Sequence, residues 1–134
     1  MRLATMRSLL LLCHDQTMRK TVLIVDDHDG FRDSARALLE SEGFEVIGTC
    51  ADGASALAAV ERLRPDVVLL DVQLPDLDGF AVAERLTTVT HPPSVVLVSS
   101  REAGAYGPRL EAAAACGFLP KGELTGAALR ALIA

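Results

Sequence analysis

Three apolar segments of strand length dominate the chain, and each ends abruptly at polar residues. They are "TVLIV" at 21–25, "DVVLLD" at 66–71 and "SVVLVSS" at 94–100. Unbroken apolar runs of this length, without alternation, are typical of strands buried on both faces, as in a parallel sheet covered by helices. The sequence therefore predicts an α/β fold.

The segments between these runs have the periodicity of amphipathic helices. In residues 30–45 the apolar positions recur three and four residues apart, and Gly43 is a natural C-terminal cap. The same spacing returns from residue 54 to 63, where Pro65 stops the pattern. Strands and helices thus alternate in units of about 20 to 30 residues, which indicates right-handed crossovers in one sheet.

The remaining elements are shorter. A β-branched run at 45–50 and "GFLPK" at 117–121 are predicted to be strands. The fourth helix is expected to begin late, with Pro108 at its first position, and to include the alanines of 112–115. A final helix is predicted over 123–134.

Composition restricts the kind of protein. The 134 residues suit one domain, and the net charge of −5, without a basic stripe, argues against direct nucleic-acid binding. The cysteines (Cys13, Cys50 and Cys116) have no zinc-site spacing, so free thiols in a reducing cytoplasm are expected.

The N-terminus precedes the first predicted strand by some distance. Its apolar stretch, Leu9 to Leu12, is too short for a secretory signal or a membrane span. Met18 stands at a natural domain start. We therefore interpret residues 1–17 as an extension and 18–134 as the domain.

Polar side chains follow the predicted strands at their carboxyl ends, where open α/β sheets place their sites. Asp26 and Asp27 follow the first strand, and Asp71 ends the third. Ser99 ends the fourth, and Lys121 follows the fifth. Three carboxylates, a hydroxyl and an ammonium are thus expected to meet at one edge of the sheet.

This inventory suits phosphoryl chemistry. Carboxylates are the hard oxygen ligands that Mg²⁺ accepts. A carboxylate beside the metal can attack phosphorus, while a lysine and a hydroxyl neutralise charge on the phosphoryl oxygens. Asp71, Lys121 and Ser99 could supply these three groups.

At this point the chain resembles the response-regulator receiver family of two-component signalling, over about residues 20–134. The resemblance is carried by an aspartate followed at fixed spacing by a proline and a glycine, and by four segments: "VLIVDDH" (22–28), "DVVLLDVQLPDLDGF" (66–80), "VVLVSS" (95–100) and "GFLPK" (117–121). It implies a doubly wound, five-stranded parallel sheet in the flavodoxin-like order 2-1-3-4-5. "GFLPK" is most similar to receivers that precede helix-turn-helix output domains.

The resemblance also implies roles for residues. Asp71 would be the phosphoacceptor, and Asp26, Asp27 and the backbone carbonyl of Gln73 would complete the protein ligands of Mg²⁺.

Other roles follow from the same resemblance. Ser99 and Lys121 would bind the phosphoryl group, and Ser99 and Phe118 would move on switching. Separately from the resemblance, Gln73 and Arg101 flank the predicted site, two residues after Asp71 and Ser99, and are candidates for tuning hydrolysis of the phosphoryl group. His28 is interpreted as a polar bystander.

The implied function is a phosphoryl-accepting switch of a phosphorelay, not an enzyme beyond its own phosphorylation and dephosphorylation. Its partners would be a histidine kinase or phosphotransfer protein, and a downstream protein or a second copy bound at the fourth helix, fifth strand and fifth helix. No membrane contact is expected, and the chain would be a stand-alone receiver or a receiver fragment of a longer regulator.

A non-phosphorylated interaction or dimerisation module is the alternative. A phospho-aspartate hydrolase is disfavoured, because the DxDx[TV] loop of such enzymes is missing.

Overall fold

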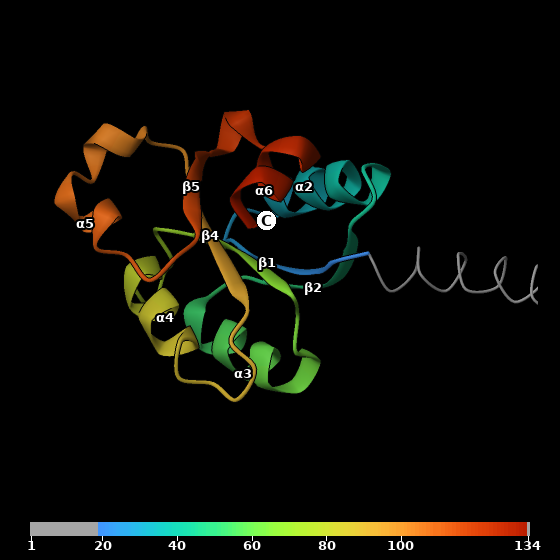
Figure 1. The fold of residues 1–134 in the computed structure, drawn as a ribbon, viewed down its shortest axis with the longest axis horizontal. Coiled ribbons are helices and arrows are strands. Elements are labelled where there is room, and N and C mark those ends of the chain that lie inside the picture. The colour runs from blue at the N-terminus through green and yellow to red at the C-terminus, as the bar shows by residue number, and fades with distance from the viewer. Residues whose placement is uncertain (1–18, 134) are drawn as a thin grey trace, which may run out of the picture.

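The computed structural model describes residues 19–133, so the predicted extension of residues 1–17 lies outside the described part. Five parallel strands form one sheet in the order β2-β1-β3-β4-β5 (Figure 1). The strands are β1 (Thr21–Val25), β2 (Glu45–Cys50), β3 (Val67–Asp71), β4 (Ser94–Ser99) and β5 (Gly117–Pro120). The predicted α/β class and strand order are confirmed.

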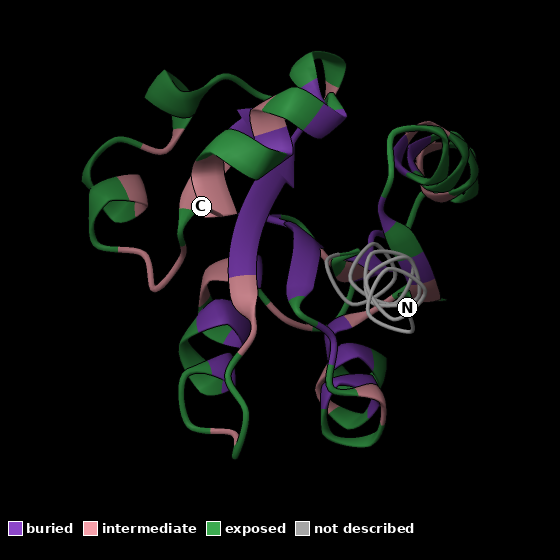
Figure 2. Ribbon diagram, turned by 45° about the vertical axis from the view of Figure 1, so that its right-hand side comes forward, coloured by how far each residue is buried: buried purple, intermediate pink, exposed green. Residues whose placement is uncertain are grey.

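Helices cover both faces of the sheet. Helices α2 (Asp29–Ser41) and α6 (Gly126–Ile133) pack on one face, and α3 (Gly53–Leu63) and α4 (Gly79–Leu86) on the other (Figure 1). One apolar cluster lies on each face of the sheet. Successive strand residues point to opposite faces, so the strands contribute side chains to both clusters. Every residue of β3 is buried, and Figure 2 shows the central strands in purple. The continuous apolar runs are thus explained by burial on both sides.

The ends of the helices follow local backbone preferences, as the sequence predicted for Gly43. Gly43 has a φ of +97°, the left-handed backbone that favours glycine after a helix. Arg64 takes the same kind of backbone after α3, with a φ of 50°, directly before Pro65. None of the helices within residues 19–133 is both long and apolar enough to cross a membrane.

The region between β4 and β5 differs from the prediction. Helix α5 begins at Pro108 as expected, but it spans only Pro108–Glu111, so the prediction that the alanines of 112–115 are helical is wrong. The N–H of Cys116 donates to the carbonyl of Val95 at 2.7 Å and brings the chain back to the sheet. The return to the sheet edge therefore overrides the high helix propensity of alanine.

The last helix is also shorter than predicted. It starts at Gly126 instead of residue 123, because a 3-10 turn, Lys121–Glu123, follows β5. The side chain of Thr125 then accepts a hydrogen bond from the N–H of Ala128 at 3.0 Å, as an N-terminal cap does.

An acidic side chain in the loop after β3 anchors the start of α3. Asp76 accepts hydrogen bonds from the N–H groups of Gly53 and Ala54 at 2.8 and 2.9 Å. These two bonds hold the pKa of Asp76 below its ordinary value. The carboxylate of Asp76 thus connects the loop after β3 to the first turn of α3.

We expect Asp76→Ala to lower the melting temperature at neutral pH, because two amides at the helix start lose their acceptor. A depressed carboxyl pKa stabilises the fold above the pKa of the unfolded chain, and this contribution disappears as pH falls through the folded value. The difference in melting temperature should therefore shrink below about pH 4. Thermal unfolding over a pH series measures it, with Asp33→Ala, exposed on α2, as control; an equal loss at every pH would contradict the assignment.

Candidate functional site

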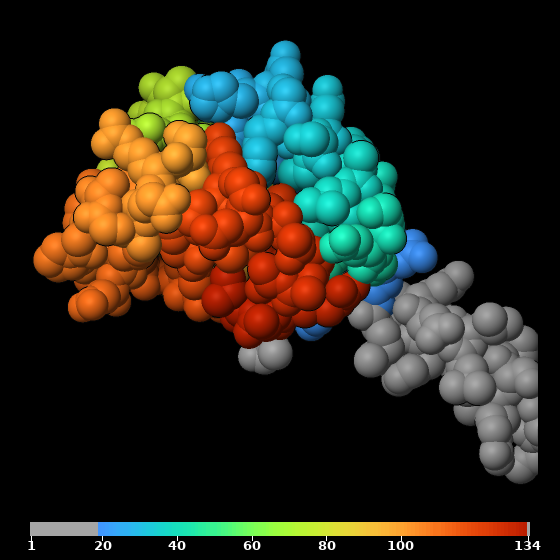
Figure 3. All heavy atoms as spheres, turned by 90° about the horizontal axis from the view of Figure 1, so that it is seen from above, coloured from blue at the N-terminus to red at the C-terminus, as the bar shows by residue number. Residues whose placement is uncertain are grey.

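The carboxyl ends of the strands form one edge of the molecule, with a cleft of about 230 Å³. Seen from above, the light-blue chain after β1, the yellow-green chain after β3 and the orange chain after β4 come together along one side (Figure 3). The cleft is lined by Asp27, His28, Asp71, Gln73, Leu74, Pro75, Ser100 and Lys121. The structure thus brings the predicted acids and lysine to one place.

Asp26 is the most buried polar group of this edge, with no exposed surface. Its N–H continues the strand pairing by donating to the carbonyl of Cys50 at 3.0 Å, which fixes the backbone. Carboxylate oxygen Oδ2 lies 2.7 Å from Lys121 Nζ but has no partner with hydrogen-bond geometry within the described chain. A buried carboxylate oxygen in this condition can still take up a cation.

Asp71 lies beside it at the end of β3, almost fully buried. Burial and, after it, the charge of Asp26 raise the pKa of Asp71 to about 6, although the N–H of Gln73 and the ammonium of Lys121 oppose the rise. The Gln73 N–H donates to Oδ1 at 3.2 Å, and Lys121 Nζ lies 3.5 Å from Oδ2. Two neighbouring buried carboxylates therefore share one lysine.

Lys121 reaches the acids because β5 ends at Pro120, directly before it. Its ammonium lies over the ring of Phe31, 4.8 Å from the centroid, and only 15% of the side chain is exposed. The ring and the two carboxylates hold the cation on three sides.

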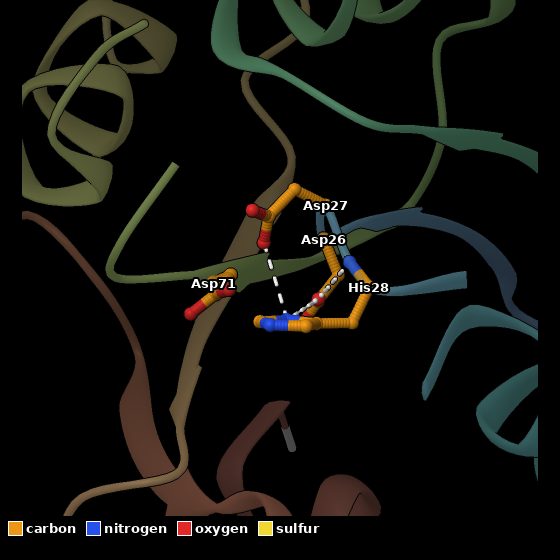
Figure 4. A group of neighbouring side chains, drawn as sticks. All are labelled: Asp26, Asp27, His28 and Asp71. Atoms are coloured by element: carbon orange, nitrogen blue, oxygen red, sulfur yellow. Dashed lines mark hydrogen bonds and ion pairs between the residues drawn. The ribbon is translucent and has the colours of Figure 1, made fainter. Parts of the chain in front are cut away.

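His28 takes a larger part in the cluster than its interpretation as a bystander suggested. Its Nδ1 lies 3.1 Å from Asp26 Oδ1 and 3.2 Å from Asp27 Oδ1 (Figure 4), and 3.5 Å from Lys121 Nζ. The backbone N–H of His28 also donates to Asp26 at 2.9 Å. The imidazole is thus a polar neighbour of both acids, although the side chain is 68% exposed. Sequence reasoning had no signal for it beyond its adjacency to the acids.

The donor set fits a divalent cation. Single ligand atoms from Asp26, Asp27, His28 and Asp71 lie within 4.8 Å of one another (Figure 4). Three of these are hard carboxylate oxygens, open to the cleft through Asp27, which is exposed. Gln73 lies on the same cleft, and its carbonyl stays a predicted ligand.

Ser99 and Phe118, the two predicted switch residues, both contact Tyr106. The Ser99 hydroxyl is buried, accepts the N–H of Arg101 at 3.0 Å and lies 2.5 Å from the Tyr106 hydroxyl. Phe118 is half-buried and packs edge to face against Tyr106. Arg101 itself is exposed. Sequence reasoning missed Tyr106, because a single tyrosine in a glycine-rich loop carries no periodicity.

The loop after β3 is held by Gly79. Its N–H donates to the carbonyl of Val72 at 2.7 Å. A Cβ at this position would lie 2.3 Å from the carbonyl oxygen of Asp71. Glycine is therefore required at position 79 by this close approach and not by a positive φ. Asp78 caps α4 by accepting the N–H of Phe80 at 2.7 Å.

Comparisons with known proteins agree with this geometry. Residues 22–133 match the family model of the response regulator receiver domain. The chain is 37% identical over 102 residues to response regulator GacA of Pseudomonas aeruginosa, covering 75% of this chain and 48% of the relative. It is 34% identical over 101 residues to the DNA-binding transcriptional activator EvgA of Escherichia coli, covering 75% and 50%. The chain spans about half the length of the curated relatives it matches.

Solved structures agree as well. The signal receiver domain of a NarL response regulator from Mycobacterium tuberculosis superposes with a TM-score of 0.75 at 34% identity, covering 85% of this chain and 96% of that one. The predicted likeness to receivers of transcriptional regulators is confirmed by these relatives. The chain therefore belongs to the response-regulator receiver domain family of two-component systems.

Proposed function

We propose that this receiver domain is a phosphoryl-accepting switch whose acceptor is Asp71. One observation carries the proposal: the carboxylate of Asp71 borders an open cleft between a fully buried acid, Asp26, and a lysine that both acids share. A carboxylate beside a second carboxylate and a cation can replace one of these ionic contacts with another when a charged ligand binds. Such an arrangement has little structural purpose, because burying paired charges rarely stabilises a fold.

In the proposed reaction an oxygen of Asp71 attacks the phosphorus of a phosphohistidine or a small phosphodonor. An oxygen–phosphorus bond forms, and the bond from phosphorus to the leaving group breaks with its electron pair staying on that group. Asp26, Asp27, Asp71 and the carbonyl of Gln73 would hold Mg²⁺. When bound, the metal neutralises charge on the phosphoryl oxygens.

The protein's own side chains complete the binding of the phosphoryl group. Lys121 would leave Asp26 and pair with a phosphoryl oxygen, since its ammonium already lies 3.5 Å from Asp71. The hydroxyl of Ser99 would donate to another phosphoryl oxygen. Gln73 and Arg101, two residues beyond Asp71 and Ser99, are the proposed modulators of hydrolysis.

Movement of Ser99 and Phe118 would change the surface of α5, β5 and α6 and so bias partner binding. The proposed partners are a histidine kinase or phosphotransfer protein in the cytoplasm, and a downstream protein or a second copy at that surface. In this proposal the domain catalyses only its own phosphorylation and dephosphorylation.

Incubation with acetyl phosphate or phosphoramidate, with and without Mg²⁺, tests the proposal. We expect intact mass spectrometry to show a gain of one phosphoryl group that requires Mg²⁺. Asp71→Asn keeps the shape of the side chain but cannot form the acyl phosphate, so this gain should disappear.

Beryllofluoride binding in the presence of Mg²⁺ covers the case of a short-lived adduct, because it mimics the bound phosphoryl group without turnover. Asp76→Asn serves as the matched control, since this aspartate lies on the same loop but faces α3. Absence of both phosphorylation and beryllofluoride binding would exclude the switch and favour the alternative, an interaction module.

A further inference from the structure

The hydroxyl of Tyr106, the single tyrosine of the chain, lies 2.5 Å from Ser99 Oγ. We propose that Tyr106 is a latch: it engages the Ser99 hydroxyl in the unphosphorylated protein and must release it when Asp71 carries a phosphoryl group. This inference rests on the proposed function, in which Ser99 donates to a phosphoryl oxygen. It adds a positioning residue from the loop between β4 and α5.

In the latch, the Tyr106 oxygen and a phosphoryl oxygen compete for the single proton of the Ser99 hydroxyl. A serine hydroxyl has one proton to donate and two lone pairs. One lone pair of Ser99 accepts the N–H of Arg101 at 3.0 Å. The latch assigns the single proton of Ser99 to the Tyr106 oxygen. Since phosphoryl oxygens only accept, Ser99 can serve the phosphoryl group only after it has left Tyr106.

Two other aromatic rings hold the tyrosine in place. The Tyr106 ring packs edge to face against Phe80 on α4, with centroids 5.7 Å apart, and against Phe118 on β5 at 5.9 Å. Such contacts are favourable beyond the area that they bury. Opening the latch therefore also disturbs the packing of α4 and β5, and Phe118 is the residue already proposed to move.

Open space next to Tyr106 can accommodate its side chain after it releases Ser99. A cleft of about 370 Å³ lies beside it, and its wall includes the loop after β3 and Arg109. The guanidinium of Arg109 lies over the ring of Phe80, 4.4 Å from the centroid, and pairs with Asp78 at 2.5 Å. Release of Ser99 can thus be accompanied by rotation of the phenol into open space instead of a rearrangement of the buried core.

The first test compares beryllofluoride affinity, with saturating Mg²⁺, for the wild type and Tyr106→Phe. The substitution keeps the ring and removes only the competing hydroxyl. We expect binding about 2- to 10-fold tighter, the factor that the net free energy of one hydrogen bond represents. Ser41→Ala, which removes a hydroxyl bonded to the Leu38 carbonyl at the end of α2, should leave the affinity unchanged.

The second test uses Tyr106 as its own reporter, because the chain has no tryptophan and no second tyrosine. Beryllofluoride should change the tyrosine fluorescence of the wild type as the latch opens. Ser99→Ala should change the fluorescence in the same direction before beryllofluoride is added, with little further change afterwards. A residue that merely fills space would not link the two signals.

The outcomes separate this inference from the proposed function. Equal or weaker beryllofluoride binding by Tyr106→Phe, or a tyrosine signal that ignores both ligand and Ser99→Ala, would overturn the latch while the wild type still binds. If the wild type neither binds beryllofluoride nor accepts a phosphoryl group, the proposed function itself is overturned. The fluorescence of Ser99→Ala does not depend on Tyr106→Phe being folded.

Discussion

Replacing Lys121 by methionine should destabilise the metal-free protein by about 3 kcal/mol near pH 8, in the range for removing one partner of a buried ion pair. Methionine keeps an unbranched stem against Phe31 and removes only the charge. Asp26 and Asp71, both nearly inaccessible, would then face each other without the cation 2.7 and 3.5 Å away. Urea unfolding in the presence of a chelator measures the loss.

The loss should depend on pH and on metal. The pKa of Asp71 is already raised to about 6, above the value of an unfolded aspartate, so its ionisation weakens the fold as pH rises through that range. The pKa of Asp71 is shifted upward, whereas the pKa of Asp76 is shifted downward, so the two groups affect stability in opposite directions as pH rises. Protonation below about pH 5 should therefore reduce the penalty of Lys121→Met. If the cluster binds Mg²⁺, millimolar Mg²⁺ should reduce the penalty at pH 8.

Lys20→Met is the matched control, because Lys20 is the only other lysine of the chain and is exposed. It should change the free energy of unfolding by less than about 0.5 kcal/mol. A Lys121→Met protein as stable as the wild type at pH 8 would show that the two acids are not ionised together.

Gly79→Ala is expected to cost about 3 kcal/mol and to reduce phosphoryl uptake at Asp71. The new methyl carbon would lie 2.3 Å from the Asp71 carbonyl oxygen and 2.7 Å from Val72 Cα. Both are backbone atoms, which cannot rotate away as a side chain can, so α4 or the end of β3 must shift. Chemical denaturation gives the stability, and intact mass after incubation with phosphoramidate gives the uptake.

Gly30→Ala is the control, since a Cβ there meets no atom within 4 Å and the residue lies in α2. Alanine suits a helix better than glycine, so this variant should be as stable as the wild type or slightly more stable. Similar losses in both variants would mean that the contact at Gly79 is relieved by small movements.

The sequence carries most of the information about the sheet. Burial on both faces requires unbroken apolar runs, so β3 and β4 could be located almost to the residue. The cluster at the strand ends was also predictable, because parallel strands deliver their last residues to one edge. Asp26, Asp71 and Lys121 meet there, as expected.

Features that depend on tertiary geometry were not predictable in this way. Alanine favours a helix locally, but the chain after Glu111 has to return to the sheet, so the helix ends. The need for glycine at position 79 depends on how close α4 comes to β3, which no local pattern reveals. The pairing of Tyr106 with Ser99 depends on a loop that has no periodicity.

The end of β5, one of the two edge strands of the sheet, has a consequence for behaviour at high concentration. β5 has four residues and finishes with Pro120, which has no N–H to offer to another strand. A short strand with a terminal proline is a poor template for edge-to-edge pairing between molecules. The residue that directs Lys121 into the acidic cleft thus also limits growth of the sheet into aggregates, and Pro120→Val should make the protein more prone to self-association.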